Sequence, residues 1–341
     1  MKKILIFGAG SIGNHMAYAS RRLKHEVTIT DINLKALNRM KNEIYPKRYK
    51  NWDKSISLIN YTDVFKKREN YDLIIIGTPP FTHLELLKKI KKNLNFKNIL
   101  IEKPLSVPLK NNFSVLNMEK KYKIFIGYNH SISLSFIYFI DKILKLKKED
   151  IKEIEINWCE NWLGIMNAHF WMKNKNESYL SDFKKGGGSL QEHSHGLHLA
   201  NIISEKLNLN LLDNLSCIIY KDKFKKYDLS TQFSSFNNEL NFNYRTNLIS
   251  MPARKNVILH SRKFKFEWQC NYKKDIDKIT ITNLKDYKTK SKIFKKTRSS
   301  EFENEINYIM NCSSKTYKDS PINILKGISV QKIINKLSKN F

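Results

Sequence analysis

The 341-residue chain is poor in cysteine and in long apolar segments, and each shortage excludes a class of protein. Its four cysteines lie far apart without a C-x-x-C pair, which argues against a thiolate zinc site and against a disulfide scaffold. No apolar run reaches the roughly 18 residues that a membrane-spanning helix needs. The lysine-containing, apolar start lacks a small-residue cleavage site, so we interpret it as a first strand and expect a cytoplasmic protein.

Arginine is also scarce, although the chain as a whole is strongly basic. Lysine and arginine total 61 against 32 acidic residues, a formal net charge of +29, which is typical of nucleic-acid-binding proteins. Only nine of the 61 are arginine, however, and the lysines are spread along the whole chain. We therefore expect no nucleic-acid partner and no membrane partner, and keep nucleic-acid binding as a weaker alternative.

Short apolar segments alternate with helical patterns in the N-terminal part of the chain. The segments KILIF, EVTIT, YDLIIIG, NILIE and KIFIG are predicted strands, and YDLIIIG is apolar enough to be covered on both faces, as parallel strands are. This alternation predicts an α/β region with a doubly wound parallel sheet. Later strand-like segments follow one another in quick succession, which predicts an α+β region with a mainly antiparallel sheet.

The sequence GAGSIG places Gly8, Gly10 and Gly13 in the G-x-G-x-x-G spacing directly after the first predicted strand. Gly8 permits a tight turn, Gly10 lets the backbone approach a pyrophosphate, and Gly13 allows helix and strand to pack closely. Free N–H groups at the start of the helix, at Ser11 and Ile12, favour an anion there. This context predicts a Rossmann domain that binds a dinucleotide.

An acid, Asp31, ends the second predicted strand, at the distance past the last glycine that the dinucleotide motif requires. At this place a carboxylate accepts hydrogen bonds from the hydroxyls of the adenosine ribose, and its charge repels a 2′-phosphate. The expected cofactor is therefore NAD, with NADP disfavoured.

Four further motifs, GTPPFTHLELL, EKPLS, GYNHS and GGGSLQEHSH, occur in this order along the chain. Together with the glycine loop they resemble the glucose–fructose oxidoreductase / inositol dehydrogenase (Gfo/Idh/MocA) family, over nearly the whole chain. The resemblance implies a Rossmann domain (residues 1–130), an α+β substrate and oligomerisation domain on an open sheet (131–316), and a C-terminal helix (317–341) that packs back near the Rossmann domain. It also implies an enzyme that oxidises or reduces sugars or cyclitols.

The resemblance assigns roles to residues within these motifs. The residues that it places along the dinucleotide are Thr78, Pro79, His83, Glu102 and Lys103. Lys103 of the E-K-P motif also reaches the substrate beside the nicotinamide. Asn129 and His130 are expected to contact the substrate where it meets the cofactor. His130 stands where many members carry an arginine.

Lys103 is also supported by a physical argument of its own, because it directly follows a predicted parallel strand, where ligands bind in open α/β sheets. An ammonium group near a substrate hydroxyl donates a hydrogen bond to the developing alkoxide, and takes part in proton transfer if its pKa is lowered. We therefore expect Lys103 to be catalytic.

Three histidines, His193, His195 and His198, follow a run of three glycines. If this segment is helical, residues two apart point about 200° apart, so His193 and His195 cannot share a metal. His195 could share one with His198 or Glu192, but the sequence names no third ligand, so no metal is expected. The resemblance makes His195 the catalytic partner of Lys103, and an imidazole is suited to take a hydroxyl proton while hydride leaves the same carbon. Glu192, where many members carry aspartate, and His198 are expected substrate contacts.

We therefore expect an NAD-dependent oxidoreductase that transfers a hydride between nicotinamide and a secondary alcohol or ketone of a sugar, sugar derivative or cyclitol. A catalytically silent NAD-binding sensor or scaffold is the main alternative. The family resemblance further implies a homo-oligomer, a dimer or a tetramer, formed through the exposed face of the open sheet.

Overall fold

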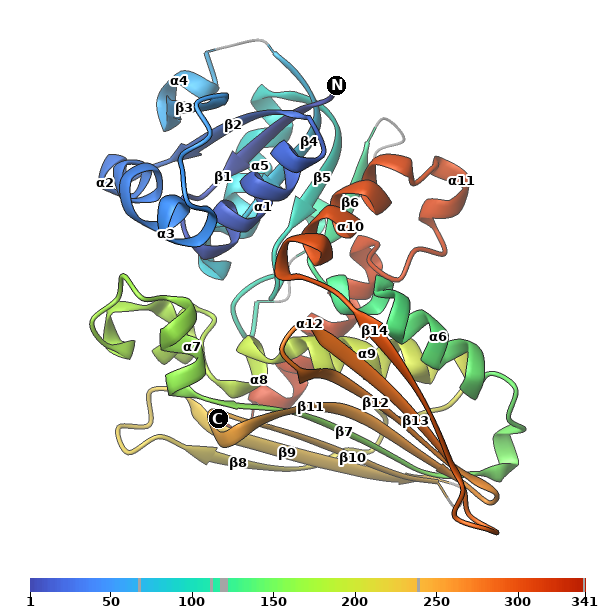
Figure 1. Cartoon of the computed structure of the whole chain (residues 1–341). Coiled ribbons are helices and arrows are strands. Elements are labelled where there is room, and N and C mark those ends of the chain that lie inside the picture. Colours follow the sequence, from blue (N-terminus) through green and yellow to red (C-terminus); the bar gives the residue numbers. More distant parts are fainter. Residues whose placement is uncertain (67–68, 111–112, 117–121, 238–239, 340) are drawn as a thin grey trace. The chain divides into compact units, whose positions relative to one another are not determined.

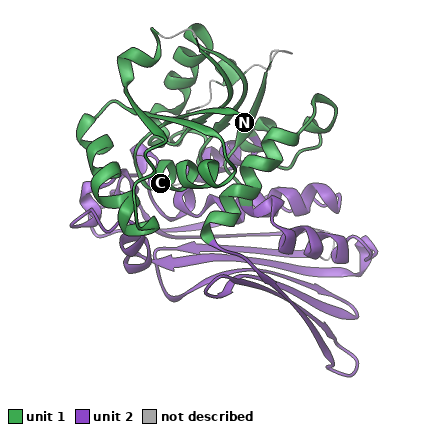
Figure 2. Cartoon of the chain, turned by 45° about the horizontal axis from the view of Figure 1, so that its top comes forward, with its two compact units in different colours: residues 1–129, 298–328 green, residues 130–297, 329–341 purple. Residues whose placement is uncertain are grey.

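The computed structural model describes residues 1–66, 69–110, 113–116, 122–237, 240–339 and 341. The chain divides into two compact units, each built on a sheet of its own (Figure 2). Unit 1 comprises residues 1–129 and 298–328, and unit 2 comprises residues 130–297 and 329–341.

Unit 1 contains a six-stranded parallel sheet in the order β3-β2-β1-β4-β5-β6. Its strands are β1 (Lys3–Phe7), β2 (Glu26–Asp31), β3 (Ile56–Asn60), β4 (Asn70–Ile76), β5 (Asn95–Ile101) and β6 (Lys123–Ile126). Helices between these strands include α1 (Ser11–Arg22), α2 (Leu34–Arg39), α3 (Tyr45–Tyr49), α4 (Tyr61–Val64) and α5 (His83–Asn93). The strand order reverses direction between β1 and β4, as in doubly wound dinucleotide-binding sheets, which confirms the predicted Rossmann sheet.

The central strands of this sheet are buried on both faces. Leu5 and Ile6 of β1 are fully buried, and so are Ile74 and Ile75 of β4. Consecutive strand residues point to opposite faces, so such runs require cover on both sides. Crossover helices such as α1 and α5 supply that cover (Figure 1).

A distant part of the chain completes unit 1. It consists of α10 (Arg298–Asn311), α11 (Ser314–Tyr317) and the first residues of α12 (Ile324–Ser338). Phe302 of α10 stacks on His15 of α1 with ring centroids 5.1 Å apart, and Arg22 donates a 2.6 Å hydrogen bond to Glu303. These contacts group residues 298–316 with the Rossmann sheet in unit 1. From the sequence, these residues were instead assigned to the second domain. The expected C-terminal segment 317–341 is likewise divided between the units after residue 328.

Unit 2 contains an eight-stranded sheet in the order β14-β13-β12-β11-β7-β10-β9-β8. Its strands are β7 (Ile151–Asn161), β8 (Ser216–Lys221), β9 (Asp228–Asn237), β10 (Leu240–Asn247), β11 (Ile249–Ser261), β12 (Phe264–Lys273), β13 (Ile276–Asn283) and β14 (Thr289–Lys295). Its helices include α6 (Leu134–Ile143), α7 (Trp162–Ala168), α8 (Ser189–Glu192) and α9 (Ser194–Lys206). Neighbouring strands are antiparallel except β7 and β10, so the predicted mainly antiparallel sheet is confirmed.

One face of this sheet is covered by helices of its own unit. α6, α8 and α9 pack on that face (Figure 1). Along β7, Ile154, Ile156 and Trp158 are at most 2% exposed, whereas the alternating Glu153 and Glu155 are half-buried. Because side chains alternate between the faces of a strand, the glutamates mark the opposite face, which we call the open face.

Among the helices of the described residues, none combines the length and the apolar character that crossing a bilayer requires.

Candidate cofactor site and active-site residues

The glycine-rich turn between β1 and α1 is built from closely packed backbone. Gly8 has a φ of +106°, and a Cβ there would lie 2.7 Å from the Gly77 oxygen. A Cβ on Gly13 would lie only 1.9 Å from the Gly8 oxygen. A Cβ on Gly10, in contrast, would meet no atom within 4 Å. Two glycines therefore close the turn, and the third borders open space into which a ligand fits.

The start of α1 offers backbone N–H groups without a competing side chain. Gly10 is the N-cap and makes no side-chain cap, and the first turn contains no acidic residue. Ser11 and Ile12 are half-buried, so these predicted cofactor contacts lie at the accessible end of the helix. A helix end of this kind favours an anion, and the pyrophosphate of NAD fits it.

Asp31 ends β2 beside this turn, as predicted. Its Oδ2 accepts a 2.8 Å hydrogen bond from the Ala9 N–H, and its Oδ1 accepts one of 2.8 Å from the Asn33 N–H. The side chain is half-buried, so the backbone holds the carboxylate without enclosing it. A carboxylate fixed in this way is oriented to accept hydrogen bonds from ribose hydroxyls.

The loop after β4 carries Thr78, Pro79 and His83. The His83 Nε2 lies 2.7 Å from the Thr78 oxygen, and its Nδ1 lies 3.3 Å from the Leu105 oxygen. Burial lowers the pKa of His83 to about 4, so the ring is neutral and the shorter contact is its N–H hydrogen bond. The side chain is fully buried. His83 thus fastens this loop from the interior of unit 1, and its contact with the cofactor stays a prediction.

Glu102 and Lys103 follow the carboxyl end of β5. The Glu102 carboxylate is buried against Gly127, where a Cβ would lie 2.8 Å from its Oε2. Burial, and after it the charge of Glu102, raise the pKa of Glu305 from α10 well above its usual value. Lys103 is half-buried and precedes Pro104 through a cis peptide bond. Glu102 therefore faces the interior, while Lys103 is the accessible residue of this motif.

The histidine segment of unit 2 is not one continuous helix. α8 ends at Glu192, and α9 begins at Ser194. His193, which lies between them, has a φ of −96° and a ψ of 20° and interrupts the helix. His193 and His198 are 3% and 1% exposed, whereas Glu192 and His195 are half-buried. Of the three histidines, His195 is thus the one with an accessible side chain.

The ring of His195 lies against two other rings of unit 2. Its centroid is 4.7 Å from that of His130, nearly perpendicular to it, and 6.1 Å from that of Trp158. His130 is only 8% exposed, and its Nδ1 lies 3.8 Å from the Cys270 sulfur. The neighbouring Asn129 is also 8% exposed. His130, predicted as a substrate contact, is thus mostly enclosed and supports the His195 ring.

Asp228 at the start of β9 fixes the segment that leads into these histidines. Its Oδ2 accepts hydrogen bonds from Ser189 Oγ at 2.6 Å, the Leu190 N–H at 2.8 Å and Thr231 Oγ1 at 2.8 Å. A Cβ on Gly188, which has a φ of +95°, would lie 2.0 Å from Asp228 Oδ1. Burial raises the pKa of Asp228 to about 6. The sequence did not single out Asp228, because no local motif surrounds it.

The open face of unit 2 carries polar groups that the sequence also left unassigned. Glu153, Glu155 and His260 place potential metal-ligand atoms within 4.8 Å of one another. Asn241 and Asn243 already donate hydrogen bonds of 2.9 and 3.2 Å to Glu153 Oε1. This group lies on β7 and β11 and does not involve the histidine segment, for which no metal was predicted.

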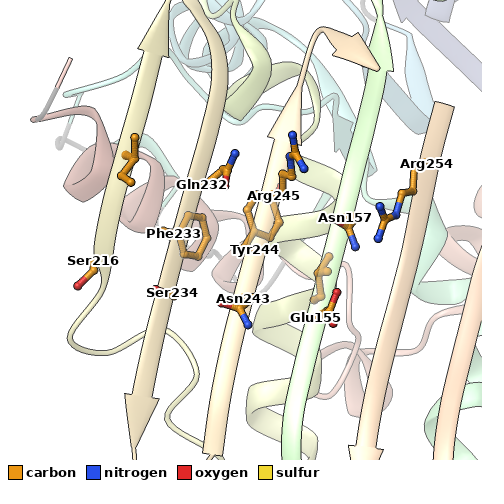
Figure 3. Close-up of a pocket in the computed structure, with 12 residues that line it drawn as sticks. Glu155, Asn157, Ser216, Gln232, Phe233, Ser234, Asn243, Tyr244, Arg245 and Arg254 are labelled. Atoms are coloured by element: carbon orange, nitrogen blue, oxygen red, sulfur yellow. The ribbon is translucent and has the colours of Figure 1, made fainter. Parts of the chain in front are cut away.

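A hollow of about 400 Å³ adjoins this group (Figure 3). Arg245 of β10 and Arg254 of β11 come from the two strands that flank β7, and both are exposed. Polar residues that line the hollow include Glu155, Asn157, Ser216, Gln232, Ser234 and Asn243.

A comparison with protein-family models finds a match for the N-terminal part of the chain. A family model described as an oxidoreductase family with an NAD-binding Rossmann fold, GFO_IDH_MocA, matches residues 2–130. The comparison with curated proteins finds no match.

Solved structures resemble the chain over both units. UDP-N-acetylglucosamine 3-dehydrogenase GnnA from Acidithiobacillus ferrooxidans is 11% identical with a TM-score of 0.69, covering 98% of this chain and 96% of that one. Levoglucosan dehydrogenase, in complex with NADH and levoglucosan, is 11% identical with a TM-score of 0.72, covering 99% and 96%. A super-repressor mutant of Gal80p from Saccharomyces cerevisiae is 12% identical with a TM-score of 0.73, covering 99% and 95%.

At these identities the structural likeness shows a shared fold and nothing finer. The family match rests on the sequence of the Rossmann region itself, where the glycine turn, Asp31 and the parallel sheet fit a dinucleotide. Residues 2–130 therefore match the GFO_IDH_MocA family of oxidoreductases, which is described by its NAD-binding Rossmann fold.

Proposed function

We propose that the protein is an NAD-dependent oxidoreductase that transfers a hydride between nicotinamide and a secondary alcohol or ketone of a sugar, sugar derivative or cyclitol. The observation that carries the proposal is the accessibility of His195 in a segment whose other two histidines are enclosed. In the NAD-binding unit, Lys103 is half-buried and lies two residues after β5, at the carboxyl ends of the strands, where open α/β sheets bind ligands.

The proposed chemistry divides a proton and a hydride between different acceptors. When bound, NAD supplies the acceptor for the hydride that leaves the carbinol carbon. His195 takes the hydroxyl proton, because imidazole is the side chain that exchanges protons near neutral pH. The Lys103 ammonium donates a hydrogen bond to the same oxygen and stabilises the negative charge that develops on it. In the reducing direction His195 returns the proton to the carbonyl oxygen.

The surroundings of His195 suit this role. A general base has to hold its ring in one orientation toward the substrate proton. The ring contacts with His130 and Trp158 restrict the His195 side chain, and Asp228 ties the preceding segment to the sheet. We propose that Glu192, half-buried three residues before His195, contacts a substrate hydroxyl.

A catalytically silent NAD-binding sensor is the second candidate. The observation that favours it is the fold that the chain shares with a super-repressor mutant of Gal80p. The same architecture therefore also occurs in a protein described as a repressor. A sensor of this kind binds NADH and a ligand but leaves the nicotinamide unchanged. The accessible Lys103 and His195 favour the enzyme instead.

One experiment separates the candidates. The purified protein is titrated with NADH by fluorescence, and then incubated with NAD or NADH and a panel of sugars, nucleotide sugars, sugar phosphates, cyclitols and their keto forms. We expect NADH binding and an absorbance change at the nicotinamide band with one compound class. NADH binding without any absorbance change supports the sensor, and affinity for duplex DNA that falls steeply with salt supports the nucleic-acid alternative.

We further propose a homo-oligomer that forms through the open face of unit 2. Ile218 and Tyr220 of β8 and Phe236 of β9 are 76%, 65% and 73% exposed. Apolar side chains gathered on one sheet face are typical of an interface. Light scattering after size exclusion is expected to show a dimer or tetramer that Ile218→Glu shifts toward monomer. Tyr287→Glu, at an equally exposed residue after β13, is the matched control.

A further inference from the structure

Arg48 of α3 places its guanidinium at the start of the glycine-loop helix. Its Nη1 donates a 3.0 Å hydrogen bond to the Ser11 backbone oxygen, and its Nη2 donates one of 2.9 Å to Ser11 Oγ. Ser11 is the first residue of α1 and directly follows Gly10, the glycine that borders open space. A half-buried cation therefore lies beside the position that fits a pyrophosphate.

Aromatic packing holds α3, and with it Arg48, against α1. Tyr49 stacks on Tyr18 with ring centroids 3.7 Å apart and planes 2° apart. His15 Nδ1 lies 2.5 Å from the Tyr49 hydroxyl. Ser11, His15 and Tyr18 are spaced by four and three residues, so they share one face of α1. The arginine thus projects from a rigid contact between two helices, and is not a loosely placed surface residue.

Arg48 brings a positive charge to a helix end that is itself partly positive. The N-terminus of a helix carries partial positive charge, so acids stabilise it and cations do not. α1 has no acid in its first turn and no side-chain cap. Burial lowers the pKa of Arg48, the nearby Tyr49 hydroxyl raises it, and the positive charge of Arg298 lowers it. The guanidinium nevertheless remains protonated, as arginine does in proteins. Helix end and guanidinium therefore converge on one place that suits a negatively charged group.

We infer that Arg48 is a further cofactor-binding residue, which pairs with the pyrophosphate of NAD at Ser11. The planar guanidinium presents several N–H donors and is the side chain best suited to phosphate oxygens. The inference rests on NAD binding by unit 1 and on no property of the substrate. The G-x-G-x-x-G spacing does not reveal it, because Arg48 lies far beyond the last glycine of the motif.

Cofactor affinity, measured without turnover, tests the inference. NADH is titrated by fluorescence into the wild type, Arg48→Gln and Arg48→Lys, and thermal unfolding confirms that each variant is folded. Loss of a charge-assisted hydrogen bond predicts an NADH Kd weaker by about tenfold or more in Arg48→Gln. Arg48→Lys keeps the charge and is expected to lose less. The matched control, Arg21→Gln, removes an arginine from the other end of α1, where it pairs with Asp53 at 2.8 Å, and is expected to leave the Kd unchanged.

Competing ligands locate the contact on the cofactor. ADP and adenosine are used to displace NADH, and NADPH is titrated in parallel. The inference predicts that Arg48→Gln weakens ADP and leaves adenosine unchanged, with equal losses for NADH and NADPH. An unchanged NADH Kd in folded Arg48→Gln overturns it, as does an equal loss for adenosine or a larger loss for NADPH than for NADH. If the protein binds NADH but converts no sugar, the proposed reaction is contradicted, whereas the inference about Arg48 is unaffected.

Discussion

The cofactor turn of unit 1 and the histidine segment of unit 2 both follow glycines, but their shapes have different origins. The turn is closed by its own backbone, since Gly8 and Gly13 meet within one short stretch of chain. The histidine segment is held by side chains from distant strands: Asp228 binds the start of α8, and the Tyr244 hydroxyl donates to the His193 oxygen at 3.2 Å. A locally closed turn can be recognised from a short motif, whereas a segment held by long-range contacts cannot.

Breaking the backbone closure of the turn is expected to have the largest effect. Gly13→Ala forces a Cβ to within 1.9 Å of the Gly8 oxygen, which we expect to lower the free energy of unfolding by about 3 kcal/mol. Gly10→Ala is the matched control, because its φ of −82° suits alanine and its Cβ meets no atom. We expect this variant to keep wild-type stability within about 1 kcal/mol and to bind NADH more weakly. Urea unfolding and NADH titration measure both, and equal stability of the two variants contradicts the proposed closure.

The two regions are expected to respond to acid with opposite sign. In unit 1, His83 has a folded pKa of about 4, below the ordinary 6.5, so the stability it confers is lost as pH falls from about 6.5 to 4. In unit 2, Asp228 has a folded pKa of about 6, above its ordinary 3.8. Burying its ionised form has a cost, so its contribution to stability falls as pH rises through that window.

Variants isolate these two contributions. The stability advantage of wild type over His83→Gln should shrink on acidification from pH 6.5 to pH 4.5. The advantage of wild type over Asp228→Asn should instead grow over the same interval. Urea unfolding of the three proteins at both pH values gives the differences, and two differences of the same sign would mean that one of the buried groups titrates otherwise.

A smaller change is expected at the ribose end of the cofactor site. Asp31→Ser removes the negative charge that disfavours a 2′-phosphate and keeps a hydroxyl that can accept from Ala9. We expect the ratio of NADPH Kd to NADH Kd to fall by about tenfold, mostly through tighter NADPH binding. A ratio that stays at its wild-type value means that Asp31 does not select between the cofactors.

Much of unit 1 could be predicted from the sequence because its signals are local. The apolar strands, the glycine turn and Asp31 each occupy a few consecutive residues, and the predicted Rossmann sheet is confirmed. β3 was not predicted, since only Ile56 of its five residues is buried and its apolar signal is weak. The membership of α10 in unit 1 was not predictable either, because it depends on contacts such as that of His15 with Phe302, which lie near opposite ends of the chain.

The candidate site could be predicted only where a motif carries it. Lys103 and His195 were named from motifs and are both accessible in the structure, although their catalytic roles stay predictions. The spacing of residues in a motif does not indicate which side chains are buried. His83 and Glu102 were expected to contact the cofactor, and the structure places both side chains in the interior. The contacts of Arg48 and Asp228 could not be predicted from a motif, because their partners, Ser11 and Ser189, lie 37 and 39 residues away in the sequence.

The role of His195 is tested most directly by replacing it with asparagine, which keeps a polar side chain but cannot act as a base. The measurement pairs an NADH titration with the rate of nicotinamide absorbance change, using the compound that the wild type converts. We predict an unchanged NADH Kd and a rate reduced by at least about a hundredfold. A His195→Asn variant that turns over at the wild-type rate contradicts the proposed mechanism.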